Sequence, residues 1–199
     1  MKQLFTDKYK NNSWKGTESR SGPGSSLKNN IKLLEALPYI IRQYNINSIL
    51  DAGCGDFNWL KHFDFNLIKS YLGVDIVDEA IQDNKKYETS NIQFKQMDIV
   101  NEPLNICFDL IICKDCLFHL SFKDALRALQ SFKQSCSTYL LATTFIGYPN
   151  NDILTGNWHR IDMETEPFNM GKPVYLIENA ENLPKTTNIE KSIGLWKIN

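Results

Sequence analysis

Ser48-Ile-Leu-Asp-Ala-Gly-Cys-Gly-Asp56 is the stretch that decides the fold of this chain. A short apolar run ends in Asp51, and Gly53 and Gly55 follow at alternate positions before a helix-compatible segment, Phe57–Phe63. This order predicts a buried strand, a tight turn and the start of a helix. Glycine suits such a turn because it allows positive φ and lets a ligand approach the backbone closely. The N–H groups at the following helix start should be free to bind a negatively charged group.

A glycine-rich turn between a strand and a helix indicates a nucleotide-like ligand without saying which one. The dinucleotide fingerprint G-x-G-x-x-G requires a third glycine, and the spacing from Gly53 places Asn58 at that position. The competing interpretation of these residues alone is an ordinary α/β turn that binds no ligand.

Length and composition favour one globular domain with a sizeable core, because the chain has 199 residues, of which 42% are hydrophobic and 12% aromatic. The net charge of −1 creates no overall field that would attract nucleic acid or a membrane surface. No apolar run approaches the length of a membrane span, and the first residues lack a secretory apolar region. These features predict a cytoplasmic protein that binds neither nucleic acid nor membrane.

The cysteine count is odd, with five cysteines and no secretion signal, which favours reduced thiols in a cytoplasm. Cys113 and Cys116 have the spacing of a redox or metal-binding pair. No second pair or histidine cluster completes a metal site, and the pair follows a predicted buried strand. We therefore predict no bound metal and interpret both cysteines as buried or turn residues.

Apolar periodicity predicts strands that alternate with helices. The first helix should begin at Ser26 and be kinked or split at Pro38. Its apolar stripe comprises Ile31, Leu34, Leu37, Ile41 and Tyr44. The later predicted elements are strands at 47–51, 71–75, 92–98, 107–113 and 138–145, and helices at 57–63, 78–86 and 121–134. This alternation predicts an α/β fold with a doubly wound, mostly parallel sheet that binds ligands at the carboxyl ends of its strands.

Acidic residues lie at or just after the ends of the first four predicted strands, at Asp51, Asp75, Asp98 and Asp115. Asp75 follows Asp51 by 24 residues, close to the spacing at which an acid binds a ribose in βαβ nucleotide folds. The two oxygens of a carboxylate can accept hydrogen bonds from both ribose hydroxyls. The alternative is that Asp75 caps a helix or lies at a solvated strand end.

The acid-and-glycine turn and the series of strand ends together resemble the class I S-adenosylmethionine-dependent methyltransferases. The turn is similar to the first motif of that family, D/E-x-G-x-G-x-G, with Phe57 in place of the last glycine. The resemblance covers about residues 46–145 and implies a Rossmann-like methyltransferase fold of seven strands with an antiparallel last strand. It also implies that Val174–Glu178 and Ile193–Ile198 form the closing strand pair.

This resemblance implies that the chain binds S-adenosyl-L-methionine. In the family the glycine turn packs against the methionine portion, the acid after the second strand holds the ribose, and the acid after the third strand meets the adenine amine. The residues of this chain implied in cofactor binding are Asp51, Gly53, Cys54, Gly55, Asp75, Ile76, Asp98, Ile99 and Lys114.

The polar N-terminal segment 1–26 contains aromatic residues, which disordered segments usually lack. Its Trp14-x-Gly-x-Glu-Ser-x-Ser-Gly-x-Gly-Ser25 pattern and the later Cys54-Gly-Asp-Phe-Asn-Trp59 resemble bacterial methyltransferases associated with small molecules and cell-surface glycans. The resemblance makes Phe57 a feature of that subfamily. It favours a lid at residues 9–25 over a disordered leader.

Within this lid, the resemblance implies that Trp14, Ser21 and Gly22 contact the cofactor.

Candidate catalytic residues follow the fourth predicted strand. A hydroxyl acceptor must lose its proton as it attacks a methyl group, so a base is expected there. Asp115 and His119 both lie in this region, and histidine has the better matched pKa at neutral pH. The alternatives are that His119 is a satisfied core or helix-entry residue and that Asp115 caps the turn or contacts the acceptor.

The segment 146–173 has no clear periodicity, and an irregular segment of this length indicates a functional loop. Trp158 offers a flat face for a sugar, His159 is a polar neighbour, and Arg160 offers a fork for a carboxylate or phosphate. We therefore expect these three residues to bind the acceptor. The alternative is that Trp158 packs on the sheet and Arg160 is solvated or forms a structural pair.

The sequence as a whole predicts a single methyltransferase domain, residues 1–199. It comprises a lid segment at 1–26, a cofactor-binding core at 27–145, a substrate loop at 146–173 and closing strands at 174–199. The predicted reaction transfers a methyl group from S-adenosyl-L-methionine to a hydroxyl of a small-molecule or glycan-precursor acceptor.

Three other functions compete with this prediction. One is a module that binds the cofactor without transfer, and another is a nicotinamide-dependent oxidoreductase, which the missing third glycine disfavours. A nucleic-acid methyltransferase is disfavoured because the chain has no basic stripe. In addition, Lys114–Leu117 does not match the N/D-P-P-Y/F motif of amino methyltransferases.

Overall fold

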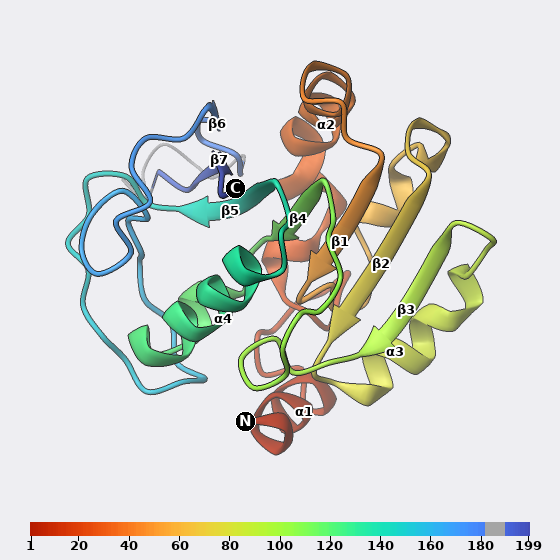
Figure 1. Ribbon diagram of the computed structural model, residues 1–199. Helices are drawn as coiled ribbons and strands as arrows, with labels where there is room; N and C mark the ends of the chain where they lie inside the picture. Colours follow the sequence, from red (N-terminus) through yellow and green to blue (C-terminus); the bar gives the residue numbers. More distant parts are fainter. Residues whose placement is uncertain (182–189) are drawn as a thin grey trace.

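A seven-stranded sheet of order β3-β2-β1-β4-β5-β7-β6 forms the centre of the protein (Figure 1). The computed structural model describes residues 1–181 and 190–199, so part of the predicted closing segment 174–199 lies outside the described residues. The strands are β1 (Ser48–Ala52), β2 (Ser70–Asp75), β3 (Ile92–Gln96), β4 (Leu110–Cys113), β5 (Tyr139–Thr144), β6 (Tyr175–Ile177) and β7 (Ser192–Lys197). The predicted fold class is confirmed.

The parallel strands place their polar carboxyl ends side by side at one edge of the sheet. Strands β1 to β5 pair in parallel, and β7 inserts antiparallel between β5 and β6. The chain moves outward from β1 to β3, then returns to the other side of β1 at β4. Ligands of open α/β sheets bind at such a switch point, outside the carboxyl ends of the strands. The topology therefore places the functional region beside the ends of β1 and β4.

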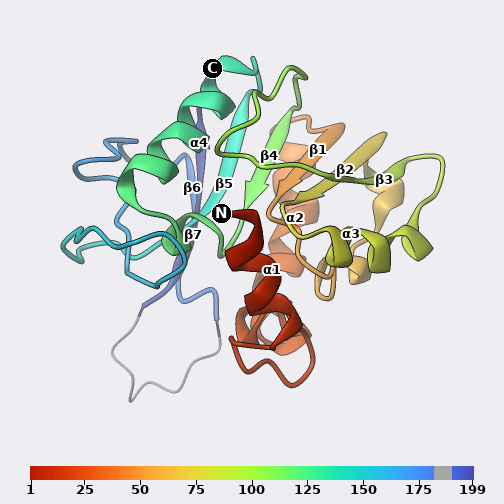
Figure 2. The same cartoon turned by 90° about the horizontal axis from the view of Figure 1, so that it is seen from below.

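Helices cover both faces of the sheet. In Figures 1 and 2, α2 (Ile31–Gln43) and α3 (Asp78–Asn84) lie on one face, and α4 (Phe122–Gln134) lies on the other. A further helix, α1 (Lys2–Lys10), lies across the carboxyl ends of the strands. Among the described helices, none is long and apolar enough to cross a membrane.

Alternation of side chains along the strands divides the core into two apolar layers. Ile49 of β1 and Leu110 of β4 pack in the layer beside α2, whereas Leu50 and Ile111 pack in the layer beside α4. All four side chains are essentially buried, as expected of central parallel strands covered by helices on both faces. Packing on both faces of the sheet therefore holds the carboxyl ends of the strands in place beneath α1.

The helix predicted at 57–63 does not form. The segment contains a single 3₁₀ turn, Leu60–His62, so the predicted regular alternation of strands and helices fails between β1 and β2. Phe57 has a φ of +57°, a left-handed conformation that cannot continue a right-handed helix. Its buried ring contacts Tyr71 and Phe94 with centroid distances of 5.4 and 4.9 Å. Aromatic packing therefore holds in place a backbone conformation that glycine adopts more easily.

The first predicted helix begins later than expected. A 3₁₀ turn precedes α2, and Ile31, which was predicted to be in the apolar stripe, is 43% exposed. Pro38 lies inside α2 without splitting it. The buried residues of the helix are Leu33, Leu37, Ile40 and Ile41. The stripe prediction was wrong at Ile31 because the helix starts only there, so this residue lies at the exposed helix entrance.

The cysteines correct one prediction and confirm another. Cys107 and Cys136 form a disulfide with an S–S distance of 1.96 Å, so the expectation of five reduced thiols was wrong. The two residues lie just before β4 and β5, which are adjacent parallel strands, and this brings them together. Cys113 ends β4 and Cys116 lies in the following turn, as predicted. Within the described ranges, no group of three or more potential ligands could hold a metal ion.

Pro38→Ala should raise the free energy of unfolding by about 1–3 kcal/mol, because alanine restores a helix hydrogen bond and removes the proline ring clash. Urea denaturation measures this difference. Glu35→Ala, at an exposed position of the same helix, is the control and should change little. A less stable Pro38→Ala protein would show that the proline ring contributes packing that outweighs the lost helix geometry.

Candidate functional site

A cavity lies at the carboxyl ends of the parallel strands, beneath the N-terminal segment. The strand ends contribute Gly53, Gly55, Asp75, Ile76, Val77, Met97, Asp98, Ile99, Val100, Lys114, Asp115, Cys116, His119 and Leu120 to its lining. The N-terminal segment contributes Met1, Phe5, Tyr9, Trp14, Ser21 and Ser25. Eleven of the predicted site residues therefore meet in one cavity, although they come from segments far apart in the chain.

The glycine turn uses all of its backbone donors inside the protein. The N–H groups of Gly53 and Cys54 donate to the carbonyl of Val74 at 2.8 and 3.0 Å. Gly55 N–H donates to Asp75 Oδ2 at 2.9 Å. The next two N–H groups, of residues 56 and 57, donate to the Ser21 hydroxyl and the Cys54 carbonyl. The expectation that free N–H groups here bind an anion was wrong, because no helix begins at this turn.

Both glycines of the turn have positive φ, +90° for Gly53 and +54° for Gly55. A Cβ at Gly53 would lie 2.9 Å from Cys116 Sγ, and one at Gly55 would overlap the Ser21 side chain. Glycine is therefore required at both positions because side chains of the protein itself pack against the turn, whether or not a ligand also approaches it.

Asp75, at the end of β2, is half-buried and retains acceptor capacity. Its Oδ2 accepts the Gly55 N–H and its Oδ1 accepts the Val77 N–H, both at 2.9 Å. Each carboxylate oxygen has two lone-pair directions, so both can accept one further hydrogen bond. Burial raises the pKa of Asp75, while the backbone donors oppose the shift. The side chain can therefore receive a pair of hydroxyl groups from within the cavity.

The Asp98 carboxylate, after β3, accepts more hydrogen bonds within the protein than that of Asp75. Its Oδ1 accepts the N–H groups of Val100 and Asn101, and its Oδ2 accepts the Asn101 amide at 2.8 Å. Ile99 and Met97 line the cavity beside it. One acceptor direction on Oδ2 remains for a donor such as an exocyclic amine.

Asp51 and Cys54 do not line the cavity, although both were predicted to contact the cofactor. Asp51 is buried and accepts a hydrogen bond from the Tyr71 hydroxyl at 2.8 Å. Burial raises the pKa of Asp51 to about 7, and the negative charge of Asp75 adds to the shift. Cys54 is buried with its thiol against Asn84. Both residues therefore pack in the interior behind the turn and do not face the cavity.

The N-terminal segment is docked on the glycine turn by hydrogen bonds. Asp56 accepts the Ser19 hydroxyl at 2.8 Å and the Arg20 N–H at 2.9 Å. The Asn58 side-chain amide donates to Glu18 Oε1 at 2.6 Å and to the Ser25 carbonyl at 2.9 Å. The two sequence patterns of the resemblance, at 14–25 and 54–59, are thus physical partners in one structure.

Within this docked segment, Trp14 and Ser21 line the cavity and Gly22 does not. Gly22 has a φ of +100° and supports Trp14, because a Cβ there would lie 3.0 Å from Trp14 Cβ.

Sequence reasoning missed α1, whose N-cap Met1 and whose residues Phe5 and Tyr9 line the cavity. Their spacing of four residues is the signal that could have indicated one face of a helix.

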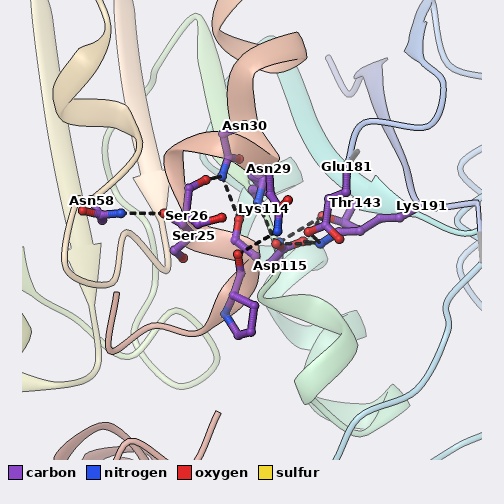
Figure 3. A network of polar contacts seen from close by, with 12 residues as sticks. Ser25, Ser26, Asn29, Asn30, Asn58, Lys114, Asp115, Thr143, Glu181 and Lys191 are labelled. Atoms are coloured by element: carbon purple, nitrogen blue, oxygen red, sulfur yellow. Dashed lines mark hydrogen bonds and ion pairs between the residues drawn. The ribbon is translucent and has the colours of Figure 1, made fainter. Parts of the chain in front are cut away.

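The fourth strand end carries a charge network that Figure 3 shows in close view. Asp115 lies 2.6 Å from Lys114 Nζ and 2.7 Å from Lys191 Nζ, and it accepts the Thr143 hydroxyl at 2.9 Å. Burial alone would raise the pKa of Asp115, but the two lysines outweigh it and hold the pKa well below its usual range. Lys191 also pairs with Glu181, and sequence reasoning identified neither residue.

Lys114 lines the cavity, but its ammonium group is occupied by Asp115 and by the Gly24 carbonyl at 2.9 Å. Burial lowers the pKa of Lys114, and the Asp115 charge opposes the shift. Lys114 therefore ties the docked N-terminal segment to the fourth strand end.

His119 lines the cavity and forms no ion pair within the described residues. Its Nδ1 lies 2.9 Å from the Asn157 carbonyl oxygen, which can only accept, so Nδ1 carries the proton. The Trp14 ring lies 5.8 Å from the imidazole, centroid to centroid. Burial lowers the pKa of His119, so the ring is neutral at pH 7 and Nε2 carries a lone pair.

The three predicted acceptor residues, Trp158, His159 and Arg160, do not line the cavity. Trp158 is 48% exposed, with its ring edge-on to Phe118. His159 is buried, and Arg160 lies over the Tyr148 ring at 4.6 Å. The segment 146–173 contains no helix or strand, as predicted, but these three side chains are not among those that line the cavity.

Comparison with known families relates part of the chain to methyltransferases. The family profile described as "Methyltransferase domain" matches residues 49–138, which contain the glycine turn, Asp75, Asp98 and His119. Residues 49–138 therefore match a methyltransferase domain, and this match supports S-adenosylmethionine-dependent methyl transfer. A search of curated protein sequences found no match.

Solved methyltransferase structures share this fold. An S-adenosylmethionine-dependent methyltransferase from Clostridium acetobutylicum has a TM-score of 0.61 at 15% identity, with 84% of this chain and 91% of that chain covered. Magnesium protoporphyrin IX methyltransferase from Synechocystis, with bound SAH, has 0.59 at 12% identity, covering 85% and 83%. The N-terminal domain of EvdMO1, in the presence of SAH and D-fucose, has 0.58 at 11% identity, covering 82% of each chain.

The cavity of this methyltransferase fits S-adenosylmethionine by its chemistry. A dinucleotide cofactor places its pyrophosphate on free N–H groups at a helix start, and this turn offers none. S-adenosylmethionine has a ribose but no phosphate, and Asp75 retains acceptors for a diol. The absence of free N–H donors in the turn is therefore compatible with S-adenosylmethionine and incompatible with a nicotinamide dinucleotide.

Asp51→Asn should gain stability relative to the native protein as the pH rises. The folded-state pKa of Asp51, about 7, exceeds the value of 3.8 for an unburied group, so the unfolded chain releases this proton first. Native stability is therefore lost progressively between about pH 4 and pH 7. Asparagine does not ionise and still accepts the Tyr71 hydrogen bond.

The difference in unfolding free energy between variant and native protein should shift by about 2 kcal/mol in favour of Asp51→Asn between pH 5 and pH 7. Denaturation at both pH values measures it. A difference that does not vary with pH would show that Asp51 is ionised in the folded protein throughout.

Asp56→Ala should release the N-terminal segment from the turn, because it removes the acceptor of Ser19 and Arg20. Hydrogen exchange at residues 18–24 should become faster, and the Kd for S-adenosylhomocysteine should rise about tenfold. Asp64→Ala, which removes a hydrogen bond at a distant turn, is the matched control. Native exchange rates in Asp56→Ala would refute the docking role.

Proposed function

We propose that this methyltransferase transfers the methyl group of S-adenosyl-L-methionine to a hydroxyl of a small molecule or glycan precursor, with His119 as general base. The observation that carries this proposal is the state of His119, a neutral cavity imidazole with its proton on Nδ1. Its Nε2 lone pair can accept a proton at neutral pH. A hydroxyl needs such an acceptor, because it must lose its proton as it attacks.

Asp115 is a poor candidate for this base. Two lysines and the Thr143 hydroxyl occupy its carboxylate, and its pKa is held well below the usual range. A carboxylate of such low basicity has little tendency to take a proton near pH 7. We assign Asp115 to holding Lys114 and Lys191 in place beneath the N-terminal segment.

The cofactor roles follow from the strand ends. Bound S-adenosylmethionine supplies an activated methyl group on a sulfonium cation. We assign the ribose hydroxyls to Asp75, because both of its oxygens retain an acceptor direction. We assign the adenine amine to Asp98 and the ring faces to Ile76 and Ile99, which line the same part of the cavity.

The predicted domain parts also belong to this proposal. Residues 9–25 act as a lid, since Asp56, Asn58 and Lys114 hold them over the cavity. The segment 146–173 acts as a substrate loop mainly through the backbone contact of Asn157 with His119. The EvdMO1 domain was crystallised in the presence of D-fucose, a hydroxylated sugar, but at 11% identity the likeness transfers only the fold.

An alternative function is a module that binds the cofactor without transfer. The neutral, oriented His119 favours an enzyme, because a binding module has no need of a proton acceptor in the cavity.

Asp75→Ala should reduce the affinity for S-adenosylhomocysteine at least about 100-fold, because the ribose loses a bidentate acceptor. Calorimetric titration measures the affinity, and a thermal melt checks that the variant folds. Asp78→Ala, which removes a surface ion pair with Lys2, is the control. Native affinity in Asp75→Ala would remove the ribose assignment.

His119→Gln should slow methyl transfer about 100-fold or more, while the Kd for the cofactor changes little, because a general base contributes to the chemical step. Transfer of a labelled methyl group to a panel of hydroxylated acceptors measures the rate. His62→Gln, at an exposed histidine, is the control. Full activity of His119→Gln would exclude this residue as the base.

A further inference from the structure

We propose that the turn Thr155–Asn157 is a positioning device for His119, fixing the tautomer in which Nε2 faces the reaction as a base. The proposal rests on the proposed function and goes beyond it by assigning a role to a turn that does not line the cavity. Two hydrogen bonds link backbone groups of the turn to the histidine, one to its side chain and one to its carbonyl. Asn157 O accepts from His119 Nδ1 at 2.9 Å, and Gly156 N–H donates to the His119 carbonyl at 2.7 Å.

The first consequence concerns the ring. An isolated neutral imidazole can carry its proton on either nitrogen, and a base requires a lone pair on the nitrogen that meets the acceptor hydroxyl. A carbonyl oxygen opposite Nδ1 stabilises one of the two tautomers and also fixes the ring orientation. The second bond, from Gly156 to the His119 backbone, prevents the histidine and the turn from moving apart.

The turn is itself anchored to the start of α4. The Thr155 hydroxyl accepts the Ser121 N–H at 2.9 Å and donates to the Asp124 carboxylate. Asp152 accepts the Phe122 N–H at 2.7 Å. The N-terminal N–H groups of a helix lack partners within the helix, so these contacts stabilise α4 and the turn together. The position of the carbonyl opposite His119 therefore depends on a rigid element of the fold.

The N-terminal helix supports the turn from the other side. Gly156 has a φ of +100°, and a Cβ there would lie 2.5 Å from Leu4 Cδ2 of α1. Leu4 thus packs directly on the turn, while Trp14 lies beside the His119 ring. The turn lies between α1 and the segment that follows β4, in contact with both.

Charged groups near His119 do not replace this device. Asp115 favours the charged imidazole, whereas Lys8 and Lys191 oppose it. These charges shift the balance between the charged and the neutral ring. A direct hydrogen bond to one nitrogen, in contrast, favours one of the two neutral tautomers.

The test is nitrogen-15 NMR of the whole protein labelled at histidine, recorded above the pKa of His119. Comparison with His119→Gln assigns the His119 signals, and exposed His62 is the internal reference. The expected native result is a protonated Nδ1 and an unprotonated Nε2. A native His119 with its proton on Nε2 overturns the proposal, whatever the activity of the enzyme.

Thr155→Val removes both side-chain bonds that anchor the turn while preserving its shape. The expected result is a mixture of His119 tautomers and a kcat lowered about tenfold, with the cofactor KM unchanged. Leu154→Ser, at a neighbouring side chain that is 80% exposed, is the matched control and should keep native tautomer and kcat. An unchanged tautomer and kcat in a folded Thr155→Val protein overturn the proposal.

Gly156→Ala is the second variant, in case Thr155→Val does not fold, because it strains the turn without removing the anchor. It should give the same tautomer mixture and loss of kcat, and native values for both would count against the device. Failure of the proposed function can be distinguished from failure of this proposal. If native His119 is protonated on Nδ1 but His119→Gln stays fully active, the turn fixes the tautomer and His119 is not the base.

Discussion

Pairing between the N-terminal segment and the glycine turn is the interaction on which the rest of the site depends. Asp56 and Asn58 bind that segment with side-chain hydrogen bonds, and Ser21 accepts the N–H of Asp56 in return. These contacts also bring Trp14 over the fourth strand end. The Ser21 contact occupies one backbone donor of the turn, and Val74, Asp75 and Cys54 accept the other N–H groups. The cavity floor therefore offers no free donors for a phosphate, and the docked segment closes the cavity above it.

Neutralisation of charge at the fourth strand end complements this pairing. Asp115 is balanced by Lys114 and Lys191, and all three are buried or nearly so. A buried charge is tolerated only when it is paired in this way. Because this network occupies Asp115, we propose His119, which forms no ion pair within the described residues, as the general base. The backbone around Asn157 then determines which nitrogen accepts the proton.

Local patterns in the sequence predicted the parts of the site that lie next to each other in the chain. The apolar runs and their terminal acids predicted the sheet and the place of Asp75, because strand ends need only local sequence to be located. The helix after the glycine turn was predicted wrongly, since the left-handed Phe57 is held by rings from other strands. The partners Lys191 and Glu181 were missed because their pairing with Asp115 is set by the tertiary fold. Trp158, which was predicted to bind the acceptor, does not line the cavity, and the position of its side chain is likewise set by the tertiary fold.

Calorimetric titration of the native protein with S-adenosylhomocysteine and NAD in parallel tests the central claim most directly. That claim is that the cavity takes a nucleoside cofactor without phosphate groups, because the turn that faces it has no free N–H donors. The account predicts a Kd for S-adenosylhomocysteine on the order of 1 μM and no detectable heat with NAD. Binding of NAD with similar or greater affinity would contradict it.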